Sequence, residues 1–96
     1  MSFNGIDILY EKRIVLVEEQ IVPLTYKEFE LLYYLLENQD IVLTREMLMN
    51  KVWGFDFEGE TRTVDVHIAT LRQKLGEKGK LIQTIRNVGY KLGSAL

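Results

Sequence analysis

The stretch from residue 61 to residue 75, TRTVDVHIATLRQKL, constrains the fold of this 96-residue chain more than any other. Four aliphatic residues recur in it at i, i+4, i+7 and i+11, namely Val64, Ile68, Leu71 and Leu75. This spacing places them on one stripe of a helix, and such a stripe must be buried against other elements. The sequence therefore predicts an amphipathic helix over 61–75 that packs on a core.

The opposite side of this predicted helix carries no acidic and no bulky side chain. With about 100° of rotation per residue, it presents Arg62, Thr63, Val66, Ala69, Thr70 and Gln73. His67 and Lys74 lie on one shoulder, and Asp65 and Arg72 lie on the other. A narrow face of this kind fits the major groove of DNA, and basic side chains on its shoulders can reach the phosphates.

Charge is distributed unevenly along the chain. The formal net charge of −2, taken alone, argues against nucleic acid as a partner. Residues 1–60, however, hold 12 acidic and 5 basic residues (−7), whereas residues 61–96 hold 2 acidic and 7 basic residues (+5). The basic segment can dock on a polyanion while the acidic one faces away, although these charges could also serve only solubility. Because DNA repels the acidic half, we expect a second copy to bind beside the first.

Length and composition limit the class of protein. The chain is long enough for one small domain, 1–96, and its lack of cysteine excludes disulfides and thiolate zinc sites. We expect a cytoplasmic protein with no membrane contact, because no apolar run approaches the roughly 18 residues of a membrane span. His67 is the only histidine and no glycine-rich phosphate loop is present. We therefore expect no enzyme, no catalytic residues, no metal site and no cofactor.

Short β-branched runs dominate the first part of the chain. Three of them, at 6–10, 14–17 and 21–22, are separated by hydrophilic turns and predict an antiparallel sheet of three strands. Pro23 ends the pairing because it has no N–H to donate. A further run at 41–43 is long enough only for a bridging strand.

Two helix starts are visible between these runs. Thr25 with Glu28 three residues later forms a capping box, which predicts a first helix reaching about Asn38. Thr44 is a second N-cap residue, and it predicts a short helix that ends at Gly54 with left-handed geometry.

The residues after position 75 predict a hairpin. Gly76 suits a helix end, 77–80 is expected to be a lysine-rich loop, and an alternating strand starts at Ile82. The turn at 87–89 should hold Gly89 in the left-handed conformation, with Arg86 at the tip. A basic hairpin tip next to a groove-binding helix is typical of a wing that reaches the DNA backbone or the minor groove.

The predicted elements together describe an α+β fold. It is a winged helix-turn-helix, a three-helix bundle with an N-terminal antiparallel sheet and a C-terminal β-hairpin wing at 82–92. The stretches RTVDVHI (62–68), LRQKL (71–75), IQTIR (82–86) and GYK (89–91) resemble the OmpR/PhoB-type effector domains of two-component response regulators. Leu24-Thr25, Glu28-Phe29, Leu31-Leu32 and Val52-Trp53-Gly54 are also similar to that family, so the resemblance covers nearly the whole chain.

The resemblance implies sequence-specific binding of double-stranded DNA and transcription regulation in a phosphorelay, by a C-terminal domain that appears here without its receiver domain. The DNA contacts that it implies are Trp53, Arg62, Thr63, His67, Arg72, Thr84, Arg86 and Tyr90. It also implies an RNA polymerase contact through the loop of Phe55, Asp56, Phe57 and Glu58. Its further partners would be the receiver domain and a second copy on repeated half-sites. Ala69 and Thr70 stand where family members often hold basic residues.

The residues themselves predict the kind of DNA site. Arg62 is the groove-facing residue able to make a bidentate guanine contact, Val66 and Ala69 offer methyl groups to thymine, and Gln73 can pair with adenine. We therefore expect A·T-rich positions flanked by one guanine. The predicted phosphate contacts are Arg72, Lys74, Arg86, Lys91 and either Lys78 or Lys80.

Three alternatives remain open from the sequence. The domain could be a winged-helix protein–protein interaction module that binds no DNA. Val66 could be a tolerated surface residue without a role in recognition, and Phe55 and Phe57 could pack back on the bundle instead of contacting a partner. Steep salt dependence on duplex DNA would separate a DNA-binding domain from a protein-binding module.

Overall fold

The computed structural model describes residues 1–93. Its N-terminal part is an antiparallel sheet in the order β1-β2-β3-β4, with one strand more than the sequence predicted. The additional strand β1 is joined to β2 by Asn4 and Gly5, which both have positive φ, as a two-residue hairpin turn requires. The strands are β1 (Ser2–Phe3), β2 (Ile6–Leu9), β3 (Ile14–Val17) and β4 (Gln20–Ile21).

Tyr10 does not continue strand β2, contrary to the sequence prediction. It opens a short 3-10 helix, η1 (Tyr10–Lys12), which ends at Arg13 with φ of 56°. The ring of Tyr10 stacks on Tyr33 with 4.4 Å between centroids. Strand β2 thus ends where Tyr10 stacks on a helix, and the alternation of residues in the sequence does not reveal such a contact.

The two predicted helix starts are confirmed. Helix α1 (Tyr26–Glu37) begins at the predicted capping box, in which Thr25 N–H donates to Glu28 Oε1 at 2.8 Å. Helix α2 (Arg45–Trp53) begins at Thr44, whose hydroxyl oxygen accepts from Met47 N–H at 3.1 Å. Gly54 ends α2 with φ of 98° and ψ of 157°, so its φ is positive as predicted but its backbone is not left-handed helical.

Helix α3 (Arg62–Leu75) buries the predicted stripe of Val64, Ile68, Leu71 and Leu75. The residues that follow it are not the predicted loop but a second 3-10 helix, η2 (Gly76–Leu81). Gly79 allows this tight turn to pack on α3, because a Cβ at this position would lie 2.4 Å from the carbonyl oxygen of Arg72.

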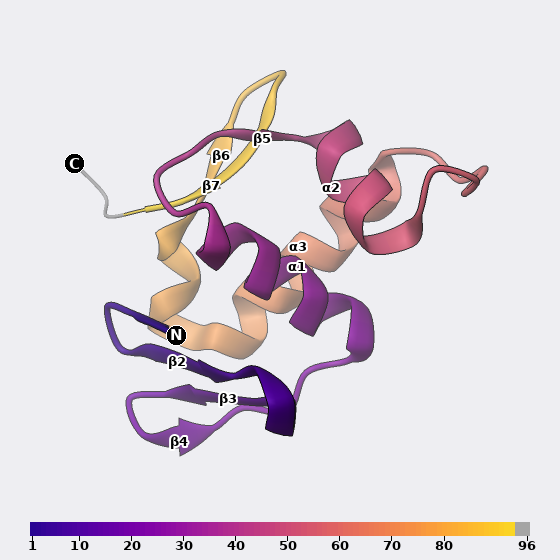
Figure 1. Cartoon of the computed structure of the whole chain (residues 1–96). Coiled ribbons are helices and arrows are strands. Elements are labelled where there is room, and N and C mark those ends of the chain that lie inside the picture. The colour runs from indigo at the N-terminus through magenta and orange to yellow at the C-terminus, as the bar shows by residue number, and fades with distance from the viewer. Residues whose placement is uncertain (94–96) are drawn as a thin grey trace.

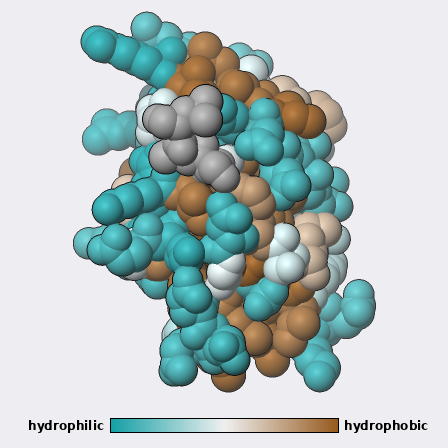
Figure 2. Space-filling view, turned by 90° about the vertical axis from the view of Figure 1, so that its left-hand side faces the viewer, coloured by the Kyte–Doolittle hydropathy of each residue, from teal (hydrophilic) through white to brown (hydrophobic). Residues whose placement is uncertain are grey.

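The core extends from the N-terminal sheet through the helices to a second sheet. It contains Ile6, Ile8 and Val15 of the first sheet, leucines of α1, the stripe of α3, and residues of the second sheet such as Ile82 and Leu92. In Figure 1 the sheet lies at one end of the molecule, the helices lie in the middle, and a second sheet lies at the other end. Figure 2 shows that hydrophilic residues cover much of one side and break its hydrophobic surface into patches. Within residues 1–93, no helix is long and apolar enough to cross a membrane.

The second sheet contains the predicted hairpin and the predicted bridging strand. Its strands are β5 (Leu43–Thr44), β6 (Ile82–Ile85) and β7 (Gly89–Leu92), in the order β5-β7-β6. The prediction for Gly89 is wrong, because the residue with positive φ in the turn is Asn87, at 65°. Gly89 instead permits close strand contact, since a Cβ there would lie 1.9 Å from the carbonyl oxygen of Leu43. We call the β6–β7 hairpin the wing.

Candidate nucleic-acid interface

The outward side of α3 is a narrow, exposed stripe. It consists of Arg62, Val66, Ala69 and Gln73, one residue per turn, and none of them is buried. Val66 is 54% exposed, although it is aliphatic. We call these four residues the outward stripe, and they coincide with the positions that the sequence placed toward the bases.

Arg72 joins α3 to the wing. Its Nε and Nη2 atoms donate to the carbonyl oxygen of Ile82 at 3.0 and 2.6 Å, and Nη2 also donates to Thr84 Oγ1 at 2.7 Å. The guanidinium lies 5.4 Å from the ring centroid of Tyr90. Arg72 and Thr84, both predicted DNA contacts, are therefore engaged with each other and hold the wing beside the outward stripe.

Tyr90 makes a second connection between α3 and the wing. Tyr90 is only 4% exposed, and its hydroxyl donates to Asp65 Oδ1 at 2.5 Å. Arg45 Nε donates to the same oxygen at 2.8 Å. Burial would raise the pKa of Asp65, but hydrogen bonds from Tyr90 and Arg45 outweigh it and lower that pKa. Burial and the bond to Asp65 raise the pKa of Tyr90.

Arg45 is a residue of the site that sequence reasoning missed. It begins α2, twenty residues before Asp65. The signal available in the sequence was Asp65 itself, because a single acidic residue on a helix facing DNA requires a cationic partner within the protein.

Thr70 and Lys74, also predicted DNA contacts, turn toward α1. Thr70 Oγ1 donates to Glu28 Oε2 at 2.7 Å, and Lys74 Nζ donates to Glu28 Oε1 at 2.7 Å. Burial alone would raise the pKa of Glu28, but the bonds from Lys74, Thr25 and Thr70 lower it to about 2. Glu28 is thus ionised and fully hydrogen-bonded at neutral pH.

Trp53 and His67 meet on the side of α3 that faces α2. Their rings are in edge contact at 5.0 Å, and His67 Nδ1 lies 2.9 Å from the carbonyl oxygen of Thr63. All three side chains are half-buried. The structure therefore brings Trp53, Thr63 and His67 together at one border of the outward stripe.

The loop between α2 and α3 contains two phenylalanines with different environments. Phe57 packs against Trp53 with 6.1 Å between centroids and is 37% exposed, whereas Phe55 is 86% exposed. Asp56 and Glu58 are also exposed. One phenylalanine thus packs back on the helices, and the other is available to a partner.

The basic side chains around α3 differ in whether they are already paired. The side chains of Arg62 and Arg86 form no hydrogen bond or salt bridge within residues 1–93, and both residues are exposed. Lys78 pairs with Glu18 at 3.0 Å, and Lys80 pairs with Glu77 at 3.3 Å on the open surface. A groove of about 460 Å³ continues from Ala69 and Gln73 toward Lys80.

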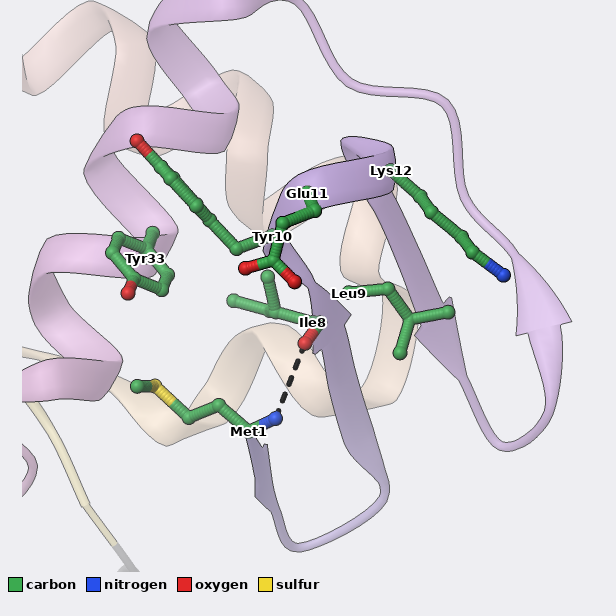
Figure 3. A pocket seen from close by; sticks show the side chains of 7 residues that line it. All are labelled: Met1, Ile8, Leu9, Tyr10, Glu11, Lys12 and Tyr33. Atoms are coloured by element: carbon green, nitrogen blue, oxygen red, sulfur yellow. Dashed lines mark hydrogen bonds between the residues drawn. The ribbon is translucent and has the colours of Figure 1, made fainter.

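A separate hollow of about 360 Å³ lies beside the N-terminal sheet (Figure 3). Its lining comes from β2, η1 and α1 together with the first residue, and consists of Met1, Ile8, Leu9, Tyr10, Glu11, Lys12 and Tyr33. None of these residues belongs to α3 or to the wing. This hollow is therefore not part of the candidate interface.

Sequence comparison identifies relatives of this arrangement. A family profile described as "Transcriptional regulatory protein, C terminal" matches residues 18–92. The alkaline phosphatase synthesis transcriptional regulatory protein PhoP of Bacillus subtilis is 51% identical over 78 residues, which cover 78% of this chain and 32% of PhoP. The regulatory protein VanRB of Enterococcus faecalis is 46% identical over 82 residues, covering 85% of this chain and 36% of VanRB. The chain thus spans about a third of the length of these curated relatives.

Solved structures share the fold. The DNA-binding domain of the response regulator AdeR, crystallised with an intercistronic region, has a TM-score of 0.89 and 29% identity, covering 99% of this chain and all of that one. The Klebsiella pneumoniae RstA DNA-binding domain, crystallised with the RstA box, has a TM-score of 0.86 and 30% identity, with 97% and 95% covered. DrrB, an OmpR/PhoB homolog from Thermotoga maritima, has a TM-score of 0.87 and 30% identity, with 98% and 44% covered. The chain belongs to the family of transcriptional regulatory protein C-terminal domains and is a winged-helix DNA-binding domain of the OmpR/PhoB type.

Proposed function

We propose that α3 enters the major groove of double-stranded DNA with its outward stripe toward the bases, while the wing follows the backbone or the minor groove. The observation that carries this proposal is the outward stripe itself, which is exposed, free of acidic residues and flanked by a wing fixed through Arg72. A helix of this width fits the major groove, and a fixed wing sets the register along the backbone. AdeR and RstA, whose domains were crystallised with DNA, have the same fold.

Each residue of the outward stripe suits a different base edge. Arg62 can donate both guanidinium nitrogens to guanine, and Gln73 can pair with adenine. Val66 and Ala69 present methyl groups to the methyl group of thymine. We therefore expect an operator with A·T-rich positions flanked by one guanine.

The remaining contacts divide by how freely each side chain can move. We assign Arg86 at the wing tip and Lys91 as phosphate contacts, because neither side chain has to break a salt bridge within residues 1–93 to reach DNA. Trp53, Thr63 and His67 border the stripe and would meet the backbone beside α2. Arg72, Thr84 and Tyr90 act by holding the wing in position, and their own contacts with DNA would be secondary.

The domain would act as the output domain of a cytoplasmic two-component response regulator. Its proposed partners are a receiver domain, a second copy on a repeated half-site and RNA polymerase. For the polymerase contact, we assign the exposed Phe55 with the acidic residues Asp56 and Glu58, because an anionic loop with an aromatic anchor suits a basic surface.

A salt titration tests the DNA-binding mode. Affinity for a duplex should fall steeply with salt, and Arg86→Ala should lower the slope of log affinity against log salt by about one unit on every sequence. Glu46→Ala, which removes an exposed acid from α2, is the control that should not lower the slope. A wild-type domain without steep salt dependence would favour the protein-binding alternative, and an Arg86 effect confined to one sequence would contradict the assigned phosphate contact.

A further inference from the structure

Glu28 forms a buried polar cluster next to the outward stripe. Glu28 is 3% exposed, and its carboxylate receives three hydrogen bonds, from Thr25 N–H, Thr70 Oγ1 and Lys74 Nζ. Both oxygens are used, and the three distances are 2.8, 2.7 and 2.7 Å. Two of these donors come from α3, 42 and 46 residues away in the sequence.

Burial distinguishes this ion pair from the other lysine pairs near α3. The acids of the Lys78–Glu18 and Lys80–Glu77 pairs lie on the open surface, so either lysine can exchange its carboxylate for a DNA phosphate while water solvates the carboxylate left behind. If Lys74 left Glu28, a buried carboxylate would lose its cation in a place that water hardly reaches. Lys74 is therefore held far more firmly than an ordinary surface lysine.

Thr70 is held in the same way. Its hydroxyl lies 2.7 Å from Glu28 Oε2 and 3.0 Å from the carbonyl oxygen of His67, and the carboxylate is both the nearer and the stronger acceptor. Together with Lys74, it forms the border of α3 that faces α1. Both residues are exposed, and the Lys74 side chain is 39% exposed, but their donor groups are bonded to the buried Glu28.

We propose that Glu28 withholds Lys74 and Thr70 from DNA and so confines recognition by α3 to the outward stripe, which keeps the affinity for random sequences low. This inference rests on the proposed binding of DNA through α3. Glu28 acts through other residues and is a positioning residue, since its buried carboxylate is not available to touch DNA.

The test is a set of salt titrations on a random-sequence duplex. Lys74→Met should leave the slope of log affinity against log salt unchanged, because the paired lysine releases no counterions. Glu28→Gln, which keeps an oxygen for the Thr25 cap, should free Lys74 and steepen the slope by about one unit. This corresponds to about a fourfold additional gain in affinity when salt is lowered fourfold. Adding Lys74→Met to Glu28→Gln should return the slope to the wild-type value.

Arg86→Met serves as the matched control. Because Arg86 is an exposed cation, its removal should lower the slope by about one unit in both the wild-type and the Glu28→Gln backgrounds. A lower slope for Lys74→Met in the wild-type background would overturn the inference. An unchanged slope for Glu28→Gln would overturn it as well.

A measurement on the wild-type domain covers the case in which Glu28→Gln does not fold. The ammonium resonance of Lys74 in NMR spectra should stay unchanged when random duplex is added, and a shift typical of phosphate contact would overturn the inference. If the wild-type domain binds no duplex at all, the proposed function fails. If it binds and Lys74 responds as a free cation, only the role of Glu28 fails.

Discussion

Val66 is the aliphatic residue in the middle of a helix face that otherwise carries polar or very small side chains. It is more than half exposed on the outward stripe, so burial in the core does not explain it. A β-branched side chain also has no advantage on an exposed helix surface, where it lowers helix propensity slightly. Contact with a thymine methyl group would account for it.

Replacing Val66 therefore tests whether it takes part in recognition. Val66→Ala should relax the preference at one A·T step and leave the affinity for random duplex nearly unchanged, because no charge is altered. Competition between a selected site and single-step variants of it would measure this. Equal losses on specific and random DNA would show that Val66 has no role in base preference.

Glu28 makes the stability of the domain sensitive to acid. Its pKa in the folded protein is about 2, below the ordinary value of 4.5, so its stabilising contribution is present above pH 4.5 and is lost as the pH falls toward 2. A depression of this size corresponds to about 3 kcal/mol of unfolding free energy. Urea unfolding at pH 6 and pH 2.5 should show that Glu28→Gln loses less stability on acidification than the wild type. Equal losses in both proteins would contradict this account of Glu28.

Individual side chains also mark the limit of prediction from sequence. Helical periodicity correctly assigned Arg62, Val66, Ala69 and Gln73 to one exposed face. It could not reveal that Lys74 pairs with a residue 46 positions earlier, because spacing along a helix gives the direction of a side chain and not its partner. Thr70 and Lys74, which were predicted to face DNA, are thus in contact with α1, and Arg72 is in contact with the wing.

The wing is held in position by three contacts with two other elements. Arg72 and Tyr90 connect it to α3, and pairing of β7 with β5 connects it to the segment before α2. The β5–β7 contact depends on Gly89, which lies directly opposite Thr44. Any side chain at Gly89 would meet backbone atoms of β5 and would force the strands apart.

Gly89→Ala should therefore destabilise the fold by about 2–4 kcal/mol, as overpacking against rigid backbone does. Urea unfolding would measure the loss. Gly76→Ala is the control, because a Cβ there meets nothing within 4 Å and only its positive φ of 61° is unfavourable, which costs about 1 kcal/mol. A loss for Gly89→Ala no larger than for Gly76→Ala would contradict the steric argument.

Elements were predictable where their signals are local. The caps at Thr25 and Thr44 fixed the starts of α1 and α2, since capping involves residues within one turn. Strand β1 was missed although its Asn4-Gly5 turn is a recognisable hairpin signal. The helices η1 and η2 could not be predicted, because they accompany contacts such as the Tyr10–Tyr33 stack with residues distant in sequence.

The acidic and basic parts of the sequence are in contact in the fold. Residues 1–22, which include the N-terminal sheet, hold four acidic and two basic residues, so most of the negative charge of residues 1–60 lies in α1, α2 and the loops. Glu28 and Glu18 of the acidic part pair with Lys74 and Lys78 of the basic part. A domain with net charge −2 therefore presents to DNA the basic side chains that these acids leave unpaired, such as Arg62 and Arg86. The fold class was predictable from the order of elements, which is characteristic of winged helices.

The central claim is that the outward stripe determines sequence preference by contacting base edges, with Arg62 contacting a guanine. Selection of bound duplexes from a random pool tests it most directly, by comparing the wild type with Arg62→Ala. We predict that the wild type enriches A·T-rich positions flanked by one guanine, and that Arg62→Ala loses the preference for that guanine alone. Enrichment of no motif, or a guanine preference that persists in Arg62→Ala, would contradict the account.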